Sequence, residues 1–346
     1  MKNMVHTFRL NIDWELIRLI SKIDRFDASW TTIEKKEGQS LKQLKSIATV
    51  RSVGASTRIE GSKMSDEEVK VLLENIDIIK IADRDSKEVV GYFETLDLIS
   101  ESYHDIAITE NSLKNLHNIL LKYSNKDEWH KGNYKQHSNA IEAKLPDGTQ
   151  QIIFQTTEAG FPTQDAMRHL IDWYVADNET HSLVKCALFA YEFISIHPFQ
   201  DGNGRLSRLL STLLLLKHGY KWIQYVSFEH EIESRKNEYY RVLRSCQAER
   251  PNEDVTEWIR FFFDALGNIQ NQLMKKLETK GVETKLSPKE KSILTFIENN
   301  VGCKSGDIAK KLGIPSPTVK RILPSLIENN LIEKHGAGPG TNYSIK

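Results

Sequence analysis

The sequence contains little cysteine, and this scarcity excludes some architectures. Three cysteines, Cys186, Cys246 and Cys303, occur among 346 residues, far apart and without a Cys-x-x-Cys pair. A disulfide framework or a zinc ribbon needs several cysteines at short, regular spacings. We therefore expect neither, and we expect a reducing compartment.

No apolar stretch has the length of a membrane span. The most apolar one, Leu209 to Leu216, has eight residues and includes Ser211 and Thr212, whereas a membrane-spanning helix takes about 20 apolar residues. The first residues of the chain also lack the apolar core of a signal peptide. These absences predict a cytoplasmic protein with no membrane partner.

The sequence has no net charge. Its 47 Lys or Arg residues match 47 Asp or Glu residues, which excludes a chain that is basic overall and holds nucleic acid as a simple polycation. The balance is not uniform along the chain. Residues 285–346 contain ten Lys or Arg and five Asp or Glu residues, a net charge of +5, so residues 1–284 carry −5.

The length predicts two or three domains, and most of the chain has helical periodicity. Ser65-Asp66-Glu67-Glu68 is a capping box, and helices are expected at 13–23, 86–102 and 112–122. Further helices are expected from about 163 to 280, interrupted at the His197 loop, Gly219 and Pro251. The stretch 144–154 is different. It combines the turn residues Pro146-Asp147-Gly148 with the strand-like residues Gln151 to Phe154, which predicts a short β-hairpin.

The pattern changes near residue 285. Ser287-Pro288 and Glu290 can cap a helix over 288–300, Gly313 closes a second helix that begins at Ser305, and a third runs from Ser316 to about residue 329. Two short strands, 331–334 and 343–345, then flank a glycine-rich turn. Three helices and a two-stranded wing resemble a winged helix-turn-helix domain.

The segment from His197 to Arg208 concentrates chemistry in one turn. A buried helix over about 183–196 ends before Pro198, because the residue that precedes a proline is forced out of the α conformation, and we expect His197 to be held there as a general base. The glycines at 202 and 204 allow close backbone approach before the next helix begins.

Two arginines stand where local physics disfavours them. Arg205 and Arg208 occupy the first turn of that next helix, and cations at a helix N-terminus cost about 0.3–1 kcal/mol each. A polyphosphate would reverse this penalty, since arginine binds phosphate oxygens in pairs and a helix N-terminus attracts anions. Asp201 beside such a phosphate is a natural Mg²⁺ ligand.

Other interpretations of this segment fit less well. It contains no GxxxxGK[ST] run, as a Walker A loop would, and it lacks the third glycine and the preceding strand of a dinucleotide-binding loop. A glycine-rich turn with solvated arginines remains the plain alternative.

The run from His197 to Arg208 resembles the signature of the Fic family, HxFx[D/E]GNGRxxR, at every defined position. The resemblance covers about residues 40–265 and implies a mainly α fold, a Fic helical bundle with a small β-hairpin flap. Members of this family mostly transfer AMP from ATP to a hydroxyl side chain (Tyr, Thr or Ser) of a target protein and release pyrophosphate. The resemblance therefore implies ATP as substrate and Mg²⁺ as cofactor.

The resemblance also implies roles for individual residues. His197 would deprotonate the target hydroxyl, Asp201 would hold Mg²⁺, and Phe199 would fill the core. Arg205 and Arg208 would hold the β- and γ-phosphates. The nucleotide would lie along the run Gly202, Asn203, Gly204, Arg205, Leu206, Ser207 and Arg208. The hairpin over about 144–157 corresponds to the family's flap, which aligns a target segment by strand pairing.

Tyr239, Tyr240 and Gln247 lie on one expected helix, and a tyrosine pair is by default core packing. In some Fic proteins a Tyr-Tyr pair, followed seven residues later by Asn, lines the adenine pocket. Gln247 replaces that Asn here, so its contact with the base departs from the family pattern.

A second pattern, Ser56-x-x-x-Glu60-Gly61, resembles the inhibitory [S/T]xxxE[G/N] motif of Fic proteins in which the inhibitory helix precedes the catalytic core. By itself the pattern is weak, since any helix end can match it. The resemblance implies that Glu60 pairs with Arg208 and blocks productive placement of the γ-phosphate. The same glutamate positions water for AMP removal in some relatives, so a reversible AMP transferase/hydrolase stays open.

These expectations define four regions. We predict an N-terminal helical region at 1–110, with the inhibitory helix at about 48–61, a Fic catalytic core at 111–265, a linker helix at 266–285 and a winged helix-turn-helix domain at 286–346. The resemblance also allows for a homodimer. Three other histidines, His130, His137 and His181, are expected at the surface rather than in a zinc site.

The winged helix leaves a second class of function open. Lys310, Lys311, Lys320 and Arg321 cluster on its second and third helices, and the helix from Ser316 could enter a DNA major groove. Pro324 departs from the usual recognition helix and should kink it, so protein contacts or dimerisation are the alternative. A DNA-binding regulator with a nucleotide-sensing Fic core therefore competes with the enzyme. An intact His197 favours the enzyme, since a sensor needs no general base.

Overall fold

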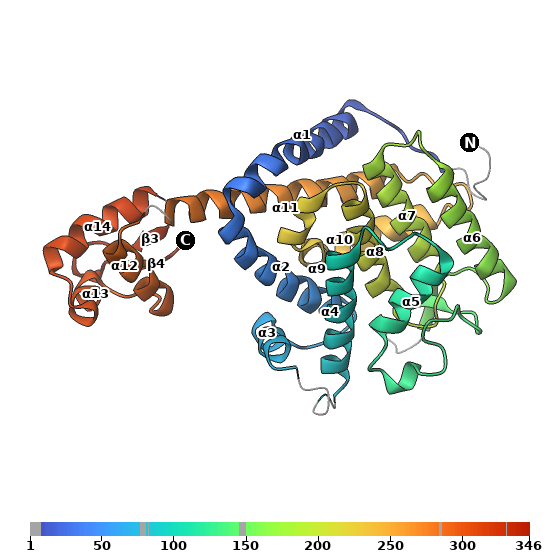
Figure 1. The fold of residues 1–346 in the computed structure, drawn as a ribbon, viewed down its shortest axis with the longest axis horizontal. Coiled ribbons are helices and arrows are strands. Elements are labelled where there is room, and N and C mark those ends of the chain that lie inside the picture. Colours follow the sequence, from blue (N-terminus) through green and yellow to red (C-terminus); the bar gives the residue numbers. More distant parts are fainter. Residues whose placement is uncertain (1–7, 77–80, 82, 145–149, 284–285, 330) are drawn as a thin grey trace. The chain divides into compact units, whose positions relative to one another are not determined.

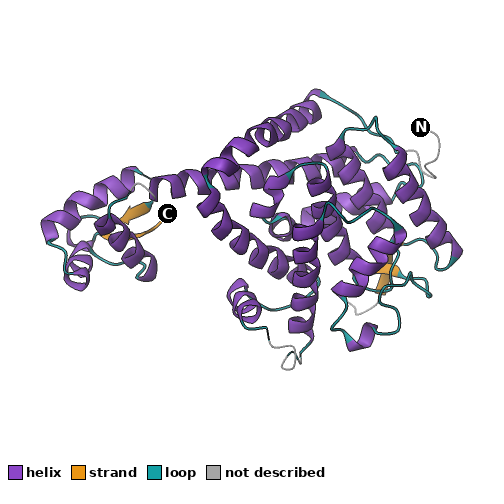
Figure 2. Ribbon diagram, in the orientation of Figure 1, coloured by secondary structure: helices purple, strands orange, loops and turns teal. Residues whose placement is uncertain are grey.

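The computed structural model describes residues 8–76, 81, 83–144, 150–283, 286–329 and 331–346. The chain divides into two compact units, Met1–Gln270 and Asn271–Lys346, and each is described by itself. The described residues are mainly helical, with two small two-stranded sheets (Figures 1 and 2). Within the described residues, no helix has both the length and the apolar character that a membrane crossing requires.

Helices form nearly all of the first unit. They are α1 (Trp14–Lys36), α2 (Gly38–Ile59), α3 (Asp66–Glu74), α4 (Arg84–Ser102), α5 (Glu110–Leu120), α6 (Phe161–Ala176), α7 (Ser182–Ile196), α8 (Asn203–Lys217), α9 (Phe228–Ser234), α10 (Lys236–Gln247) and α11 (Thr256–Glu283), with short 3₁₀ segments η2 (Asn125–Asp127) and η3 (Lys221–Tyr225). Helix α11 continues past Gln270 and includes most of the predicted linker segment 266–285.

Helices α7 and α8 form the centre of the first unit. They lie side by side, with α6 against α7 and α4 against α8 (Figure 1). Nearly every residue of α7 is buried, and the leucines of α8 from Leu213 to Leu216 are at most 1% exposed. Both helices are thus buried on nearly all sides, and the loop from His197 to Gly202 joins them.

The predicted β-hairpin is confirmed. Strands β1 (Ala140–Lys144) and β2 (Gln150–Gln155) are antiparallel, with a register irregularity between Ile141 and Glu142. The first strand begins before the predicted boundary at residue 144. The predicted turn at 146–148 lies outside the described residues.

Helix α1 is longer than the predicted helix at 13–23. Its second half buries Trp30, which stacks on Phe26 with ring centroids 5.9 Å apart and packs near Tyr225. One buried residue per two turns (Leu16, Ile23 and Trp30) leaves a weak periodic signal, so the sequence pattern ended the helix too early. Tertiary contacts with η3, and not local propensity, extend it.

The second unit contains the winged helix-turn-helix that the sequence predicted. Its elements are α12 (Pro288–Asn299), α13 (Ser305–Leu312), α14 (Ser316–Glu328), β3 (Ile332–His335), the 3₁₀ turn η4 (Gly338–Gly340) and β4 (Asn342–Ile345), with β3 and β4 antiparallel. The capping box at Ser287 is present. Pro324 lies inside α14, and the helix continues on both sides of it.

Candidate active site

His197 ends helix α7 in a left-handed conformation, with φ 54° and ψ 61°. Among the described residues it is the one non-glycine residue with positive φ, a conformation that costs on the order of 1–3 kcal/mol. Its N–H donates to the Phe193 carbonyl at 3.0 Å, and the next carbonyl, that of Pro198, accepts from the N–H of Lys135 at 2.9 Å. The surrounding chain thus holds His197 in a strained but defined position.

The His197 imidazole is neutral at neutral pH. Burial above all, and then the charge of Lys135, lower the pKa of His197 to about 4, while Glu60 and Asp201 act in the opposite direction. A neutral imidazole can accept a proton, which is what a general base requires.

Asn203 contacts the ring of His197. Its Nδ2 lies 3.1 Å from His197 Nδ1 and also donates to the Phe199 carbonyl at 2.8 Å, while its Oδ1 accepts from the Phe199 N–H at 2.9 Å. Because an amide nitrogen only donates, Nδ1 is the acceptor and the ring proton lies on Nε2. Proton uptake at Nε2 therefore requires the other tautomer, in which the contact with Asn203 is broken.

Asp201 is an ionised carboxylate just before helix α8. Burial opposes ionisation, but Arg205 and Lys126 hold the pKa of Asp201 well below its usual range. Its Oδ2 contacts Lys126 Nζ at 2.9 Å, and its Oδ1 accepts from the Gly202 N–H at 2.6 Å.

The residues around Asp201 fit an Mg²⁺ ion that a nucleotide shares with the protein, and not one held by the protein alone. No cluster of three or more acidic, His or Cys side chains that could cage a metal occurs among the residues the structure describes. Mg²⁺ that is shared with a nucleotide needs only one or two carboxylates, the phosphates and water. The half-exposed Asp201 can supply that one carboxylate once Lys126 releases it.

The N-terminus of α8 is shaped for close approach. Gly202 has φ 79°, and the first intrahelical bond of α8 runs from the Leu206 N–H to the Gly202 carbonyl, so the N–H groups of residues 203–205 have no acceptor within the helix. The side chains of Leu206 and Ser207 are buried in the core, and Ser207 Oγ donates to the Ala190 carbonyl.

Both arginines of the segment are buried and engaged. Arg205, 3% exposed, lies 3.4 Å from Glu88 Oε2 and 3.3 Å from Asp201 Oδ1. Arg208, 2% exposed, donates from Nε to Ser56 Oγ at 2.9 Å and from Nη2 to the Ser56 carbonyl at 3.0 Å. Both guanidinium groups therefore point into a site that acidic and polar groups already line.

Glu60 completes the contacts of Arg208. It follows the last residue of α2, and its Oε1 lies 2.8 Å from Arg208 Nη2, although 148 residues separate the two in sequence. Burial favours the neutral acid, but the charge and hydrogen bond of Arg208, together with the charge of Arg205, outweigh burial and lower the pKa of Glu60. Gly61, with φ 103°, turns the chain away after Glu60. The structure thus brings Ser56, Glu60 and Arg208 together as an ion pair with a supporting hydroxyl.

Gly204 allows this contact. A Cβ atom at position 204 would lie 2.4 Å from Glu60 Oε1. The absence of a side chain at Gly204 therefore lets the Glu60 carboxylate reach the first turn of α8.

The three residues of the expected adenine pocket lie on α10. Tyr239 is buried against Trp258 and Phe261, with ring centroids 5.6 and 5.8 Å away. Gln247 is also buried and donates from Nε2 to Ser195 Oγ at 3.0 Å. The charges of Glu60 and Arg208 affect the pKa of both Tyr239 and Tyr240, so the pair lies near that ion pair. A role in adenine binding stays a prediction.

The sequence patterns did not identify His117, which contacts the loop between α7 and α8. Its ring stacks on Phe199, with centroids 3.8 Å apart and planes 10° apart. Nδ1 accepts from the Gly132 N–H at 2.9 Å, so Nε2 carries the proton and donates to the Asp201 carbonyl at 2.9 Å. No local motif marks His117, because its partners are distant in sequence.

The surface assignment of His130 was wrong, because this histidine is 3% exposed. Its Nε2 lies 2.9 Å from Oδ1 of Asp127, which is itself buried. Polar neighbours in sequence hid a loop that folds inward. His137 and His181 are exposed, as expected.

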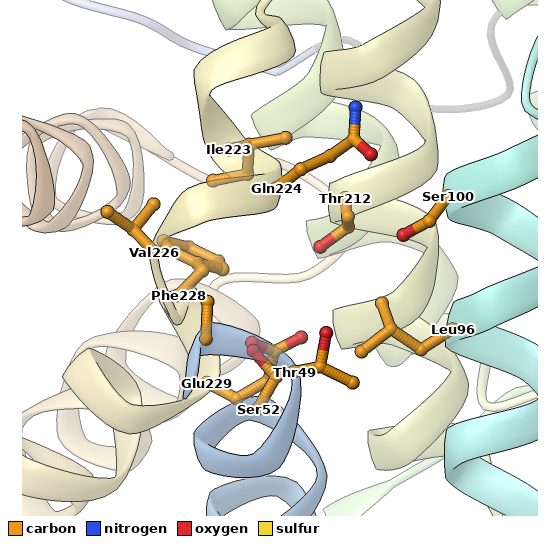
Figure 3. Close-up of a pocket in the computed structure, with 11 residues that line it drawn as sticks. Thr49, Ser52, Leu96, Ser100, Thr212, Ile223, Gln224, Val226, Phe228 and Glu229 are labelled. Atoms are coloured by element: carbon orange, nitrogen blue, oxygen red, sulfur yellow. The ribbon is translucent and has the colours of Figure 1, made fainter. Parts of the chain in front are cut away.

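A small cavity lies apart from this site. Thr49, Ser52, Ser100 and Thr212 line it together with apolar residues and Glu229 (Figure 3). None of its lining residues belongs to the segment from His197 to Arg208, so it is not the place where the chemistry of that segment would occur.

Comparisons with known proteins agree with this geometry. A model described as "Fic/DOC family" matches residues 107–215, and a model described as "Winged helix-turn-helix DNA-binding" matches residues 286–333. A protein from Drosophila yakuba named "Protein adenylyltransferase Fic" is 25% identical over 252 residues, which cover 71% of this chain and 46% of that protein. The chain thus spans less than half the length of that relative.

Solved structures show the same fold. A Fic family protein from Desulfovibrio desulfuricans G20 has a TM-score of 0.66 at 24% identity, covering 99% of this chain and 98% of that one. A Fic domain containing signaling protein from Bacteroides thetaiotaomicron has a TM-score of 0.61 at 23% identity, over 74% of this chain and 97% of its own. The buried loop of His197, Asp201 and two arginines thus lies in a Fic domain, and this chain carries that domain together with a C-terminal winged helix-turn-helix domain.

Proposed function

We propose that this chain transfers AMP from ATP to a hydroxyl side chain of a target protein. One observation carries the proposal: the junction of α7 and α8 holds a neutral histidine, an ionised aspartate and two buried arginines around a helix N-terminus. The names of the relatives, "Protein adenylyltransferase Fic", support the same reaction.

Each of these residues has a separate role in the proposed reaction. The target hydroxyl oxygen attacks the α-phosphorus, the bond from that phosphorus to the bridging oxygen of the β-phosphate breaks, and pyrophosphate leaves. His197 accepts the hydroxyl proton, and Arg205, Arg208 and the free N–H groups of α8 hold the phosphates. Mg²⁺ at Asp201 would neutralise charge on the phosphate oxygens.

We also propose that Glu60 restrains this reaction. A guanidinium group that already bonds the Glu60 carboxylate and the Ser56 carbonyl cannot present the same N–H group to a γ-phosphate. The competition is for one donor, Nη2 of Arg208.

The hairpin β1–β2, which overlaps the predicted flap over about 144–157, offers backbone groups that could pair with an extended segment of the target protein.

Mass spectrometry tests the reaction directly. The full chain is incubated with ATP and Mg²⁺, and an adduct of AMP mass is expected on the chain itself or on a captured target. His197→Ala should abolish the adduct. Absence of any adduct from wild type and from a variant without the Glu60 carboxylate would contradict the proposal.

The second unit supports a second proposal, DNA binding through residues 286–346. The match to a winged helix-turn-helix DNA-binding model and the net charge of +5 over 285–346 favour it. A mobility shift of duplex DNA by the full chain, weakened by salt, is the expected result. A shift that responds to ATP without any AMP adduct would instead support the regulator with a nucleotide-sensing core.

A further inference from the structure

Lys135 is a buried cation to which the proposed mechanism gives no role. It is 2% exposed and lies in the loop that leads into strand β1. Its backbone N–H bonds the carbonyl of Pro198, the residue after His197. A lysine is rarely buried without a reason, since burial removes the hydration of its charge.

The ammonium group of Lys135 bonds three neutral acceptors. Nζ lies 2.8 Å from Thr156 Oγ1, 3.1 Å from Asn139 Oδ1 and 3.2 Å from the Ile196 carbonyl. No carboxylate bonds Lys135 among the described residues. An ammonium group has three donors, one for each of these acceptors. Burial lowers the pKa of Lys135 to about 8, so the charged form predominates at pH 7.

These contacts join the hairpin to the loop of His197. Asn139 directly precedes β1, and Thr156 directly follows β2, so Lys135 holds both ends of the hairpin. Ile196 is the residue before His197, and Asn139 Nδ2 also donates to the Phe199 carbonyl at 3.2 Å. Three segments distant in sequence therefore meet at one ammonium group.

The charge of Lys135 also acts on the imidazole of His197. The charged groups that act on His197 are Lys135 from the loop before β1, Glu60 from the end of α2, and Asp201 from the loop before α8. Lys135 disfavours a proton on the ring, and the two carboxylates favour one. Without Lys135, burial alone would oppose the two carboxylates.

We propose that Lys135 is a positioning residue for His197: its buried ammonium group clamps both ends of the hairpin to the main chain beside His197, and its charge disfavours a proton on the imidazole. The consequence for catalysis rests on the proposed AMP transfer. The clamp and the charge effect do not, and they can be measured without ATP.

Histidine side-chain NMR titration of the full chain between pH 4 and 8 measures the charge effect, with the His197 signal assigned from His197→Asn. In Lys135→Met we expect the midpoint of His197 to rise by about one pH unit, whereas Lys135→Arg leaves it near the wild-type value. Hydrogen exchange of residues 150–156 should be faster in Lys135→Met. A successful titration with no AMP transfer in any variant would contradict the proposed function but not the role of Lys135.

The matched control is Lys185→Met, which removes another buried lysine that bonds a backbone carbonyl, that of Asp177. Lys185 acts on His218, so this variant should move the titration of His218 and not that of His197. Thr156→Val removes one acceptor and keeps the charge, so it should speed hairpin exchange and leave His197 unchanged.

An unchanged His197 midpoint in folded Lys135→Met would overturn the proposal, even if hairpin exchange is faster, because any structural lysine would produce that result. If Lys135→Met does not fold, Thr156→Val tests whether Lys135 clamps the hairpin. Unchanged exchange of residues 150–156 in that variant would also overturn the proposal.

Discussion

Single contacts of Arg208 and His197 carry the chemistry of this protein at the scale of residues. Ser56 and Glu60 engage Nε and Nη2 of the Arg208 guanidinium group, and His197 is strained, buried and neutral. Both features place charge and geometry where a nucleotide would need them. They also make the site sensitive to single substitutions.

Glu60→Gly should raise auto-AMP transfer about tenfold or more, which corresponds to about 1.4 kcal/mol of released competition for Arg208. The measurement is incorporation of α-labelled ATP into the full chain. Glu233→Gly is the matched control, since Glu233 pairs with Arg58 of the same helix α2 and not with Arg208. Equal labelling of Glu60→Gly and wild type would contradict the restraint by Glu60.

Two buried histidines should make stability depend on pH. The pKa of His117 and that of His197 are both about 4 because of burial, against about 6.5 in an unfolded chain. The unfolded state therefore binds more protons, so the stability that each neutral histidine contributes is present above pH 6.5 and is lost as the pH falls toward 4.

Between pH 7 and 5 each of these histidines should remove on the order of 1–2 kcal/mol of stability. Urea denaturation of the full chain across this range measures the loss. In His197→Asn, the dependence of the free energy of unfolding on pH should be smaller by the contribution of one histidine. A slope that does not change in this variant would show that His197 is not neutral in the folded protein.

Elements decide how the site is supported. Helices α7 and α8 are buried on nearly all sides and fix the loop between them, whereas α2 delivers Ser56 and Glu60 from one helix end. In the second unit, α14 presents Lys320 and Arg321 and continues through Pro324. A proline whose missing N–H does not end the helix leaves the element able to act as a recognition helix.

Lys320→Gln combined with Arg321→Gln should weaken DNA binding across all sequences and lower the salt slope by about two, since each cation that contacts a phosphate contributes about one. Fluorescence anisotropy with duplex DNA at several salt concentrations measures both. Lys289→Gln with Lys291→Gln, on α12, serves as the control of equal charge. Equal losses in both double variants would indicate a general charge effect and no recognition by α14.

The whole molecule consists of two compact units, and its charge is divided unevenly along the chain. All residues of the proposed transfer site lie in Met1–Gln270, and the basic segment lies in the other unit. The zero net charge of the sequence is thus the sum of −5 before residue 285 and +5 from there on. Domain boundaries near this division remain a proposal.

Removal of residues 286–346 should leave auto-AMP transfer within about twofold of wild type and abolish DNA binding, because no residue assigned to the transfer site lies in that segment. Labelling with ATP and a mobility shift on the same preparation measure the two properties. Loss of AMP transfer in a truncated chain that still unfolds cooperatively would show that the second unit is needed for the reaction.

Much of the fold and part of the site were predictable from local patterns. The capping boxes at Ser65 and Ser287, the hairpin and the three helices of the wing depend on neighbouring residues, and the structure contains them. The predicted end of α1 and the predicted surface position of His130 were wrong, since both features depend on partners that local periodicity does not reveal.

The sequence alone determined which groups stand together between His197 and Arg208, because a proline, two glycines and an amphipathic run act within a few residues. The motif resemblance already implied that Glu60 pairs with Arg208, and the structure places the two in contact. Only the tertiary structure decided that His117 and Lys126 bond Asp201 and that Lys135 lies beside His197. These contacts join residues that are 62 to 148 positions apart along the chain. Burial against partners so distant in sequence sets the charge and the position of each group, and no local pattern encodes it.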